Sequence, residues 1–138
     1  MKNIFLIACC SKKLQGSHPA EELYQSDLFK KSLAYAKQQN PDKIFILSAK
    51  HHVVELQDKL CYYNKTLNNM TAEERKLWGK TVSNQLQAKG CDFQNDKFTI
   101  LAGENYRKNL VSEISDVVIP LEGMRIGEQL HTLIELLG

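Results

Sequence analysis

Polar and nucleophilic side chains follow four short apolar runs along this chain. Arranged by run, they are Cys10, Ser11, Lys12 and Lys13, then Ser48 and Lys50, then Gly103, Tyr106 and Arg107, and last Gly123 and Arg125. Ammonium and guanidinium groups suit an anionic ligand, and a thiol or hydroxyl beside them suits nucleophilic chemistry. These residue types predict a site that holds an anion and acts on a group next to it.

The basic residues and two glycines are the candidates for holding the anion. The side chains expected to bind phosphate or to stabilise negative charge are Lys12, Lys13, Lys50, Arg107 and Arg125. Gly103 and Gly123 each precede an arginine by a few residues, and a glycine lets the backbone approach a ligand closely. The alternative is that they are turn glycines beside a solvated basic face. This alternative is weaker for the whole set than for one residue, because functional groups cluster.

Cys10 is the candidate nucleophile. Lys12 and Lys13 beside it would stabilise its thiolate. The alternative is a small buried residue that closes a strand, and the sequence assigns no base to Cys10. Cys9 is expected to face the opposite side, in the core. Ser48 and Lys50 are the other residues expected to contact the reacting group.

The segment 50–70 adds aromatic and amide groups. Tyr63 offers a ring for stacking on a nucleobase, and Asn64 an amide for hydrogen bonding to its edge, with Thr66 nearby. Equally, one of the two adjacent tyrosines packs under the loop while the other is exposed. His51 and His52 lack the spacing of metal ligands, so we expect no metal and no cofactor. One of these histidines remains a candidate acid or base.

The elements that must position these side chains follow from the hydrophobic pattern. The runs at 3–9, 43–49, 97–103 and 116–120 are predicted to be buried strands, and helices are predicted over 23–37, from 71 through Trp78, Val82 and Leu86, over 104–113 and over 126–137. Thr71 and Glu74 form a capping-box pattern. The segment 50–70 has no clear element, although 53–56 is a candidate for a short extra strand or turn.

Alternating strands and helices predict the fold and the place of the site. We expect an α/β fold, a three-layer α/β/α arrangement around a central, mainly parallel four-stranded sheet. Ligands of such sheets bind beyond the carboxyl ends of the strands, where helix N-termini also favour anions. The polar stretches all follow strands, so they are expected to share one rim.

Length and composition limit the classes of protein. The chain has 138 residues, 43% hydrophobic and 25% charged, which suits a single globular domain over 1–138. A net charge of +2 is too small to indicate nucleic-acid binding by itself. No run reaches membrane-spanning length and no signal peptide is evident, so no membrane association and a cytoplasmic location are expected. The adjacent pair among four cysteines favours reduced thiols.

Several stretches resemble a known family. "CSKKL", "ELYQSDLF", "LSAK", "YYNKTL", "LAGENYR" and "PLEGMRIGEQL" resemble small, largely uncharacterised bacterial and phage proteins, some labelled as similar to the peroxide-stress protein YaaA. The arrangement is more distantly similar to the core domain of archaeosine synthase, which modifies a deazaguanine base in tRNA. That domain looks related to the uracil-DNA glycosylase fold. The resemblance implies a nucleobase or nucleotide pocket at the strand ends.

The residues that match the family's pattern can be named individually. They are Cys10, Ser11, Lys12, Lys13, Tyr24, Ser26, Ser48, Lys50, Tyr63, Thr66, Gly103, Tyr106, Arg107 and Gly123. Two departures matter. His51-His52 stands where relatives have Tyr-Gly, which removes a glycine suited to positive φ. Asn64 stands where relatives have Asp, and an amide does not ionise, which leaves open a weakened enzyme, a binder, or chemistry that rests elsewhere.

Residues and resemblance together predict a cytoplasmic enzyme that acts on a nucleotide or nucleobase by hydrolytic, N-glycosidic or group-transfer chemistry. The alternative is a non-catalytic module that binds a nucleotide or single-stranded nucleic acid, in stress response or phage defence. Asn64 favours this alternative. A component with a protein partner is a third hypothesis, on which the sequence carries no signal.

Overall fold

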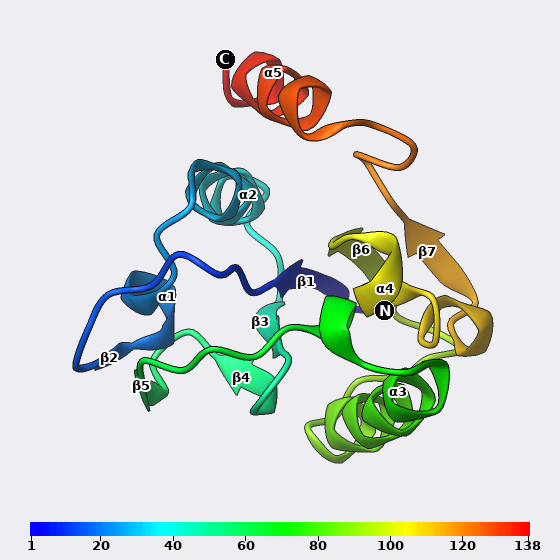
Figure 1. Cartoon of the computed structure of the whole chain (residues 1–138). Helices are drawn as coiled ribbons and strands as arrows, with labels where there is room; N and C mark the ends of the chain where they lie inside the picture. Colours follow the sequence, from blue (N-terminus) through cyan, green and yellow to red (C-terminus); the bar gives the residue numbers. More distant parts are fainter.

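A mainly parallel sheet of five strands forms the centre of the molecule, seen in a computed structural model that describes residues 1–138. Its strands are β1 (Asn3–Ala8), β3 (Lys43–Ser48), β4 (His52–Glu55), β6 (Lys97–Leu101) and β7 (Asp116–Val118). The strand order is β4-β3-β1-β6-β7. Parallel pairing joins β3, β1, β6 and β7, whereas β4 runs antiparallel to β3. The chain therefore has an α/β fold (Figure 1).

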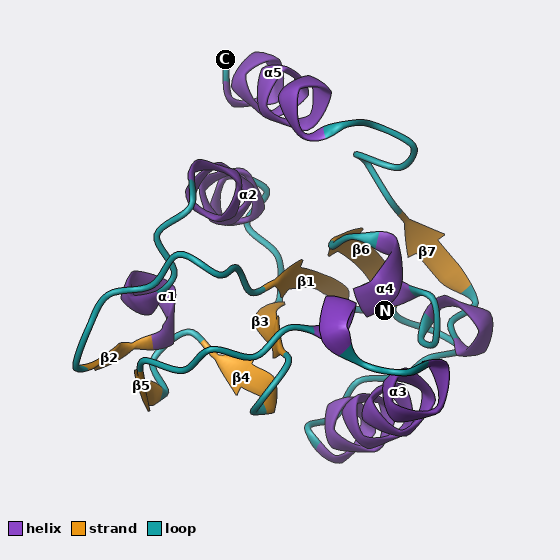
Figure 2. Cartoon of the chain, viewed as in Figure 1, coloured by secondary structure: helices purple, strands orange, loops and turns teal.

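Helices and a small second sheet surround this centre (Figure 2). The helices are α1 (Ala20–Leu23), α2 (Asp27–Gln38), α3 (Ala72–Ala88), α4 (Glu104–Arg107) and α5 (Ile126–Leu137), with 3-10 turns η1 (Leu67–Asn69) and η2 (Val111–Glu113). The short strands β2 (Ser17–Pro19) and β5 (Lys59–Cys61) pair antiparallel. None of the helices combines the length and the apolar character needed to cross a membrane.

The sheet is buried on both faces, as its apolar strands require. Alternate side chains of β1 enter two separate clusters: Leu6 packs with Trp78 of α3, and Ile7 packs with Phe29 of α2. Figure 1 shows α3 on one side of the sheet and α2 with α5 on the other. Burying both faces explains why the strands are continuously apolar rather than alternating.

The sequence predicted a four-stranded sheet, but the central sheet has five strands. The fifth strand, β4, lies in the segment 50–70 and overlaps the candidate strand at 53–56. It is short and pairs antiparallel with β3 after a tight turn, so its residues carry little periodic signal. The sheet order and the antiparallel edge are properties of the tertiary structure that the four apolar runs do not encode.

Helix boundaries follow local caps. Thr71 and Glu74 form the predicted capping box of α3, with Thr71 N–H donating to the Glu74 carboxylate at 2.9 Å. The helix predicted from residue 23 begins instead at Asp27, because the Ser26 hydroxyl accepts the Phe29 N–H at 3.1 Å. The helix predicted over 104–113 is the four-residue α4 followed by η2.

The C-terminal helix α5 packs against α2. Its apolar stripe is only partly covered: Leu133 is fully buried, whereas Ile126 and Ile134 are 66% and 53% exposed. The amphipathic pattern of α5 is confirmed as helix, but the helix uses a narrower apolar face than the pattern suggested. Its first turn instead borders a cavity at the carboxyl ends of β1 and β6.

Candidate functional site

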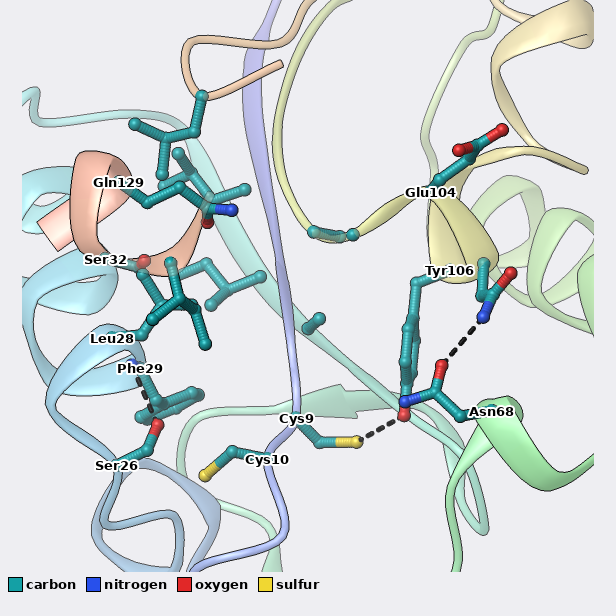
Figure 3. Close-up of a pocket in the computed structure, with 18 residues that line it drawn as sticks. Cys9, Cys10, Ser26, Leu28, Phe29, Ser32, Asn68, Glu104, Tyr106 and Gln129 are labelled. Atoms are coloured by element: carbon teal, nitrogen blue, oxygen red, sulfur yellow. Dashed lines mark hydrogen bonds between the residues drawn. The ribbon is translucent and has the colours of Figure 1, made fainter. Parts of the chain in front are cut away.

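A cavity of about 440 Å³ opens at the carboxyl ends of β1 and β6 (Figure 3). After β1 the chain continues to β3, on one side of β1 in the sheet, and after β6 it continues to β7, on the opposite side of β6. Divergent connections from neighbouring strands leave a crevice, the usual place for ligands in open α/β sheets. The residues at these two strand ends that line the cavity are Ile7, Ala8, Cys9, Cys10, Leu101, Ala102 and Gly103.

The walls of this cavity combine apolar surface with amide groups. Leu28 and Phe29 of α2 form an apolar wall on one side, shown at the left of Figure 3. Asn105 Nδ2 donates to Asn68 Oδ1 at 2.7 Å, and Gln129 Nε2 donates to the Met124 carbonyl at 2.9 Å. Each amide keeps further donors or acceptors free, which suits a ligand with both apolar faces and polar edges.

One largely buried hydroxyl and one carboxylate complete the lining. Ser32 is only 3% exposed, borders the cavity, and makes no side-chain hydrogen bond within the protein. The Ser32 hydroxyl borders the cavity, where it can hydrogen-bond to water or to a ligand. Glu104, at the start of α4, contributes the cavity's one carboxylate.

Both thiols at the end of β1 line the cavity. Cys10 fulfils the prediction that it lies at the rim, and its S–H donates to the Lys12 carbonyl at 3.2 Å. Cys9 points away from Cys10 and packs against the core clusters, as expected, but it also lines the cavity. The Cys9 sulfur lies 3.4 Å from the Tyr106 hydroxyl, as Figure 3 shows.

Cys10 has no general base beside it. Its one hydrogen bond is to the backbone carbonyl of Lys12, and no imidazole or carboxylate bonds to its sulfur. The geometry therefore does not provide the thiol–base pair of a cysteine nucleophile. Cys10 lines the cavity, and the charged group that acts on it is the Lys13 ammonium of the adjoining pocket.

A second, smaller pocket of about 170 Å³ adjoins the first. The two cavities share Cys9, Cys10, Asn68 and Tyr106, and the smaller one is further lined by Ser11, Lys13, Asn64, Lys65 and Thr66. This grouping brings together five residues that the sequence predicted as ligand-binding: Ser11, Lys13, Asn64, Thr66 and Tyr106. The lining holds two ammonium groups and no carboxylate.

Three tyrosine rings surround the Lys13 ammonium. Its Nζ lies 4.3 Å from the ring centroid of Tyr63, and 5.9 Å from those of Tyr24 and Tyr62. Such cation–π contacts stabilise the charged amine. Burial lowers the pKa of Lys13 below its ordinary value, and the nearby thiols of Cys9 and Cys10 oppose this effect.

A buried chain of hydroxyl groups lies beneath these rings. Tyr63 Oη is 2.7 Å from both Tyr24 Oη and Ser48 Oγ. The Ser48 oxygen also accepts the backbone N–H groups of Lys50 and His51, at 3.3 and 2.9 Å. Burial raises the pKa of Tyr24 to about 12 and raises that of Tyr63 further, so both phenols stay protonated at neutral pH.

The roles predicted for Ser48 and Tyr63 do not fit these positions. Ser48 is completely buried, and Trp78 Nε1 donates to its carbonyl at 2.9 Å, so its hydroxyl supports the fold rather than meeting a ligand. Tyr63 is 5% exposed with Lys13 over its ring, which leaves no face for stacking. Tyr62 is 42% exposed, so the alternative of one packed and one exposed tyrosine describes the structure.

The remaining predicted residues divide between the cavities and the surface. Gly103 and Tyr106 line the large cavity, while Arg107 and Gly123 line a third pocket of about 220 Å³. The Arg107 guanidinium donates to the Ala102 carbonyl at 3.1 Å and lies 3.9 Å from the Glu122 carboxylate, so its charge is already paired. Lys12, Lys50 and Arg125 are exposed and line none of these three cavities.

Sequence reasoning did not identify Ser32, Asn68 and Gln129 in the large cavity, and it placed Glu104 and Asn105 at the rim without assigning them a role. Glu104 and Asn105 directly follow the third apolar run, and this position was a usable signal. Ser32 and Gln129 sit inside helices, where a polar residue on a mainly apolar face was the only sign. Asn68 had no signal, because its neighbour across the cavity is 37 residues away.

His52 occupies a strained backbone position. Its φ is +65°, in the left-handed region that favours glycine. His51 lies edge-on to the Tyr63 ring, with centroids 5.3 Å apart. Burial lowers the pKa of both histidines, so they are neutral at physiological pH.

Comparison with known proteins places the chain in a family but assigns no activity. The model of a family of unknown function (DUF6884) matches residues 4–135, so the chain belongs to that family. No curated protein and no solved structure matches the chain.

Proposed function

We propose that this DUF6884 protein is an enzyme that acts on a nucleotide or nucleobase, with the base held in the cavity at the ends of β1 and β6. The observation that carries the proposal is the composition of that cavity: one apolar wall, formed by Leu28 and Phe29, faces amide groups of Asn68 and Asn105 across about 440 Å³. A nucleobase has the matching character, with flat apolar faces and an edge of donors and acceptors.

The residues that border the cavity support a chemical step on such a ligand. Cys10 contacts the ligand at the strand end, and Glu104 is the carboxylate available to accept or donate a proton. Lys13 supplies positive charge from the adjoining pocket. The reaction class is hydrolytic, N-glycosidic or group transfer, and a base pocket at strand ends is also what a uracil-DNA glycosylase-like arrangement would provide.

The proposal is tested by ligand discovery on the whole chain. Small molecules that co-purify with the protein are identified by mass spectrometry, and a thermal-shift screen covers the common nucleobases, nucleosides and nucleotides. A ligand at 100 times its Kd stabilises the native state by about 2.7 kcal/mol, which a thermal shift detects. The absence of any binding among these compounds would contradict the proposal.

A cavity-filling variant shows whether binding uses this site. A Cβ at Gly103 would meet no atom within 4 Å, so Gly103→Leu is expected to fold and to fill part of the cavity. Gly127→Leu, in α5 and outside the lining, is the matched control, because its Cβ is equally unobstructed. We expect isothermal titration to show at least tenfold weaker binding for Gly103→Leu alone. Equal affinity in both variants would place the ligand elsewhere.

A non-catalytic binding module is the second candidate function. It is favoured by the amide of Asn64 in the smaller pocket and by the lack of a base next to Cys10. Such a module would bind nucleotides or single-stranded nucleic acid, with affinity that falls as salt rises, and would form no product. The variant Asn64→Asp distinguishes the two: turnover that appears in this variant identifies a weakened enzyme, and unchanged binding without product identifies a module.

A further inference from the structure

We infer that the 170 Å³ pocket beside the base cavity is a phosphate site organised around Lys13, and therefore that the ligand is a nucleotide rather than a nucleoside or a free base. The inference rests on the proposed function for the position of the base, and it specifies the chemical class of the ligand. It depends on three features of the pocket: an uncompensated charge, a fixed position for that charge, and continuity with the base cavity.

The Lys13 ammonium is a half-buried charge without a counterion. It forms none of the ion pairs of this structure, which involve Lys37, Lys89, Arg107 and His131. Its one hydrogen bond is a long contact of 3.5 Å to the Ser11 carbonyl, although an ammonium has three N–H donors. A partly desolvated charge is normally paired. An anion that accepts the remaining N–H groups would be the missing partner.

A chain of contacts that begins at the end of β3 holds the Lys13 side chain in place. Ser48, at the end of β3, is held by two backbone N–H groups and bonds the Tyr63 hydroxyl. The Tyr63 ring, held from its other side by Tyr24, then supports the ammonium at 4.3 Å. Tyr63 is thus a positioning residue: it acts on an anion only through Lys13. Such preorganisation reduces the entropy lost on binding.

The rest of the pocket suits a phosphate group and connects it to the base. Lys65 provides a second ammonium, and the hydroxyls of Ser11 and Thr66 provide neutral donors, with no Asp or Glu in the lining. Four residues line both this pocket and the base cavity, namely Cys9, Cys10, Asn68 and Tyr106. A single ligand with a base at one end and a phosphate at the other would occupy both.

The test compares each nucleoside with its 5′-monophosphate by isothermal titration. We expect the monophosphate to bind at least tenfold more tightly, and Lys13→Gln to reduce that ratio roughly tenfold to a hundredfold while leaving nucleoside affinity unchanged. Lys80→Gln, an exposed lysine of α3, is the control that should keep the wild-type ratio. Unchanged nucleoside binding also shows that the Lys13→Gln protein is folded.

The outcomes separate this inference from the proposed function. If nucleosides and nucleotides bind equally well, the phosphate site is wrong but the base cavity stands. If neither binds, the proposed function itself fails. If nucleotides bind more tightly but Lys13→Gln behaves like Lys80→Gln, the phosphate lies elsewhere and the inference is overturned.

Two variants of Tyr63 test its positioning role. Tyr63→Phe keeps the ring beneath Lys13 but removes the hydrogen bonds to Tyr24 and Ser48, whereas Tyr63→Leu removes the ring itself. We expect Tyr63→Leu to lose the preference for the monophosphate while still binding the nucleoside, and Tyr63→Phe to retain most of that preference. The same preference in all three proteins would show that Tyr63 has only a structural role.

Discussion

Lys13 shows how a single residue acquires a role from its surroundings. In the sequence it is one of two adjacent lysines, but in the structure Lys12 is exposed while the Lys13 ammonium lies among three tyrosine rings beside two thiols. Burial lowers the pKa of Lys13 by disfavouring its charged form. This cost to the folded state is what a bound anion would offset.

Replacing Lys13 by Met should therefore stabilise the free protein and weaken nucleotide binding. The folded state binds a proton at Lys13 less tightly than the unfolded state does, so wild-type stability should rise as pH increases from the lowered pKa towards the ordinary value of 10.5. Thermal unfolding of Lys13→Met at neutral pH should show a higher midpoint than wild type. A lower midpoint would mean that the cation–π contacts outweigh desolvation.

His52 is the second residue whose backbone conformation allows a sharp prediction. A non-glycine residue in the left-handed region costs on the order of 1 kcal/mol, and His52 has a φ of +65° where the turn after β3 leads into β4. His52→Gly should therefore raise the free energy of unfolding by up to about 1 kcal/mol in urea titrations.

The adjacent residue is the control for that comparison. His51 is not among the residues with positive φ, so His51→Gly gains no relief of strain and loses its contact with the Tyr63 ring. We expect His51→Gly to be less stable than wild type by roughly 0.5–1 kcal/mol. If both glycine variants were destabilised equally, backbone strain at His52 would not contribute to stability.

At the level of elements, α3 supports the site from beneath the sheet. Its Trp78 donates to the Ser48 carbonyl and packs edge-on against Tyr106, so the helix braces residues from two strand ends. The N-terminus of α3 is set by the Thr71–Glu74 capping box. Weakening this cap should therefore lower the stability of the protein, although Thr71 does not line the ligand cavity.

Thr71→Ala tests this element. Removal of an N-cap hydroxyl typically costs about 1 kcal/mol, because the N–H of Glu74 loses its acceptor. Chemical denaturation should show that loss, with nucleotide affinity unchanged. Asn84→Ala, on the exposed face of the same helix, should show no loss, since alanine favours helix and Asn84 makes no side-chain hydrogen bond. An equal loss in both variants would contradict a specific role for the cap.

At the level of the whole molecule, the large cavity is enclosed by segments from along most of the chain. The strand ends of β1 and β6 form its floor, α2 one wall, η1 and α4 another, and the start of α5 its border through Ile126 and Gln129. The helix α5 packs mainly against α2 and keeps Ile126 and Ile134 exposed, so part of its apolar face has no cover.

Ligand binding should therefore order α5 more than the rest of the chain. Native-state hydrogen exchange with and without a saturating nucleotide should show slower exchange for the amides of α5, while α3 on the far face of the sheet changes little. Local opening has a lower free energy where few apolar contacts hold an element, and a ligand that contacts the element raises it. Equal slowing in both helices would indicate only global stabilisation.

The sequence by itself determined the α/β class, the parallel strands, the start of α3 and the polar stretches at the strand ends. Each of these depends on local signals: continuous apolar runs, the Thr71–Glu74 cap, and polar residues directly after strands. Such signals are read within a few neighbouring residues, so tertiary contacts do not have to be known. The grouping of Cys10, Ser11 and Lys13 after β1 is likewise determined by local sequence.

Only the tertiary structure decided which of these side chains line a cavity. Ser48 and Tyr63 look like functional residues in sequence but bond each other in the interior, and Arg107 is already paired with Glu122. Lys13 is distinguished from Lys12 by tyrosines that lie far along the chain. The physical reason is that burial, hydrogen-bond partners and ion pairs come from segments that are distant in sequence, and folding alone brings them together.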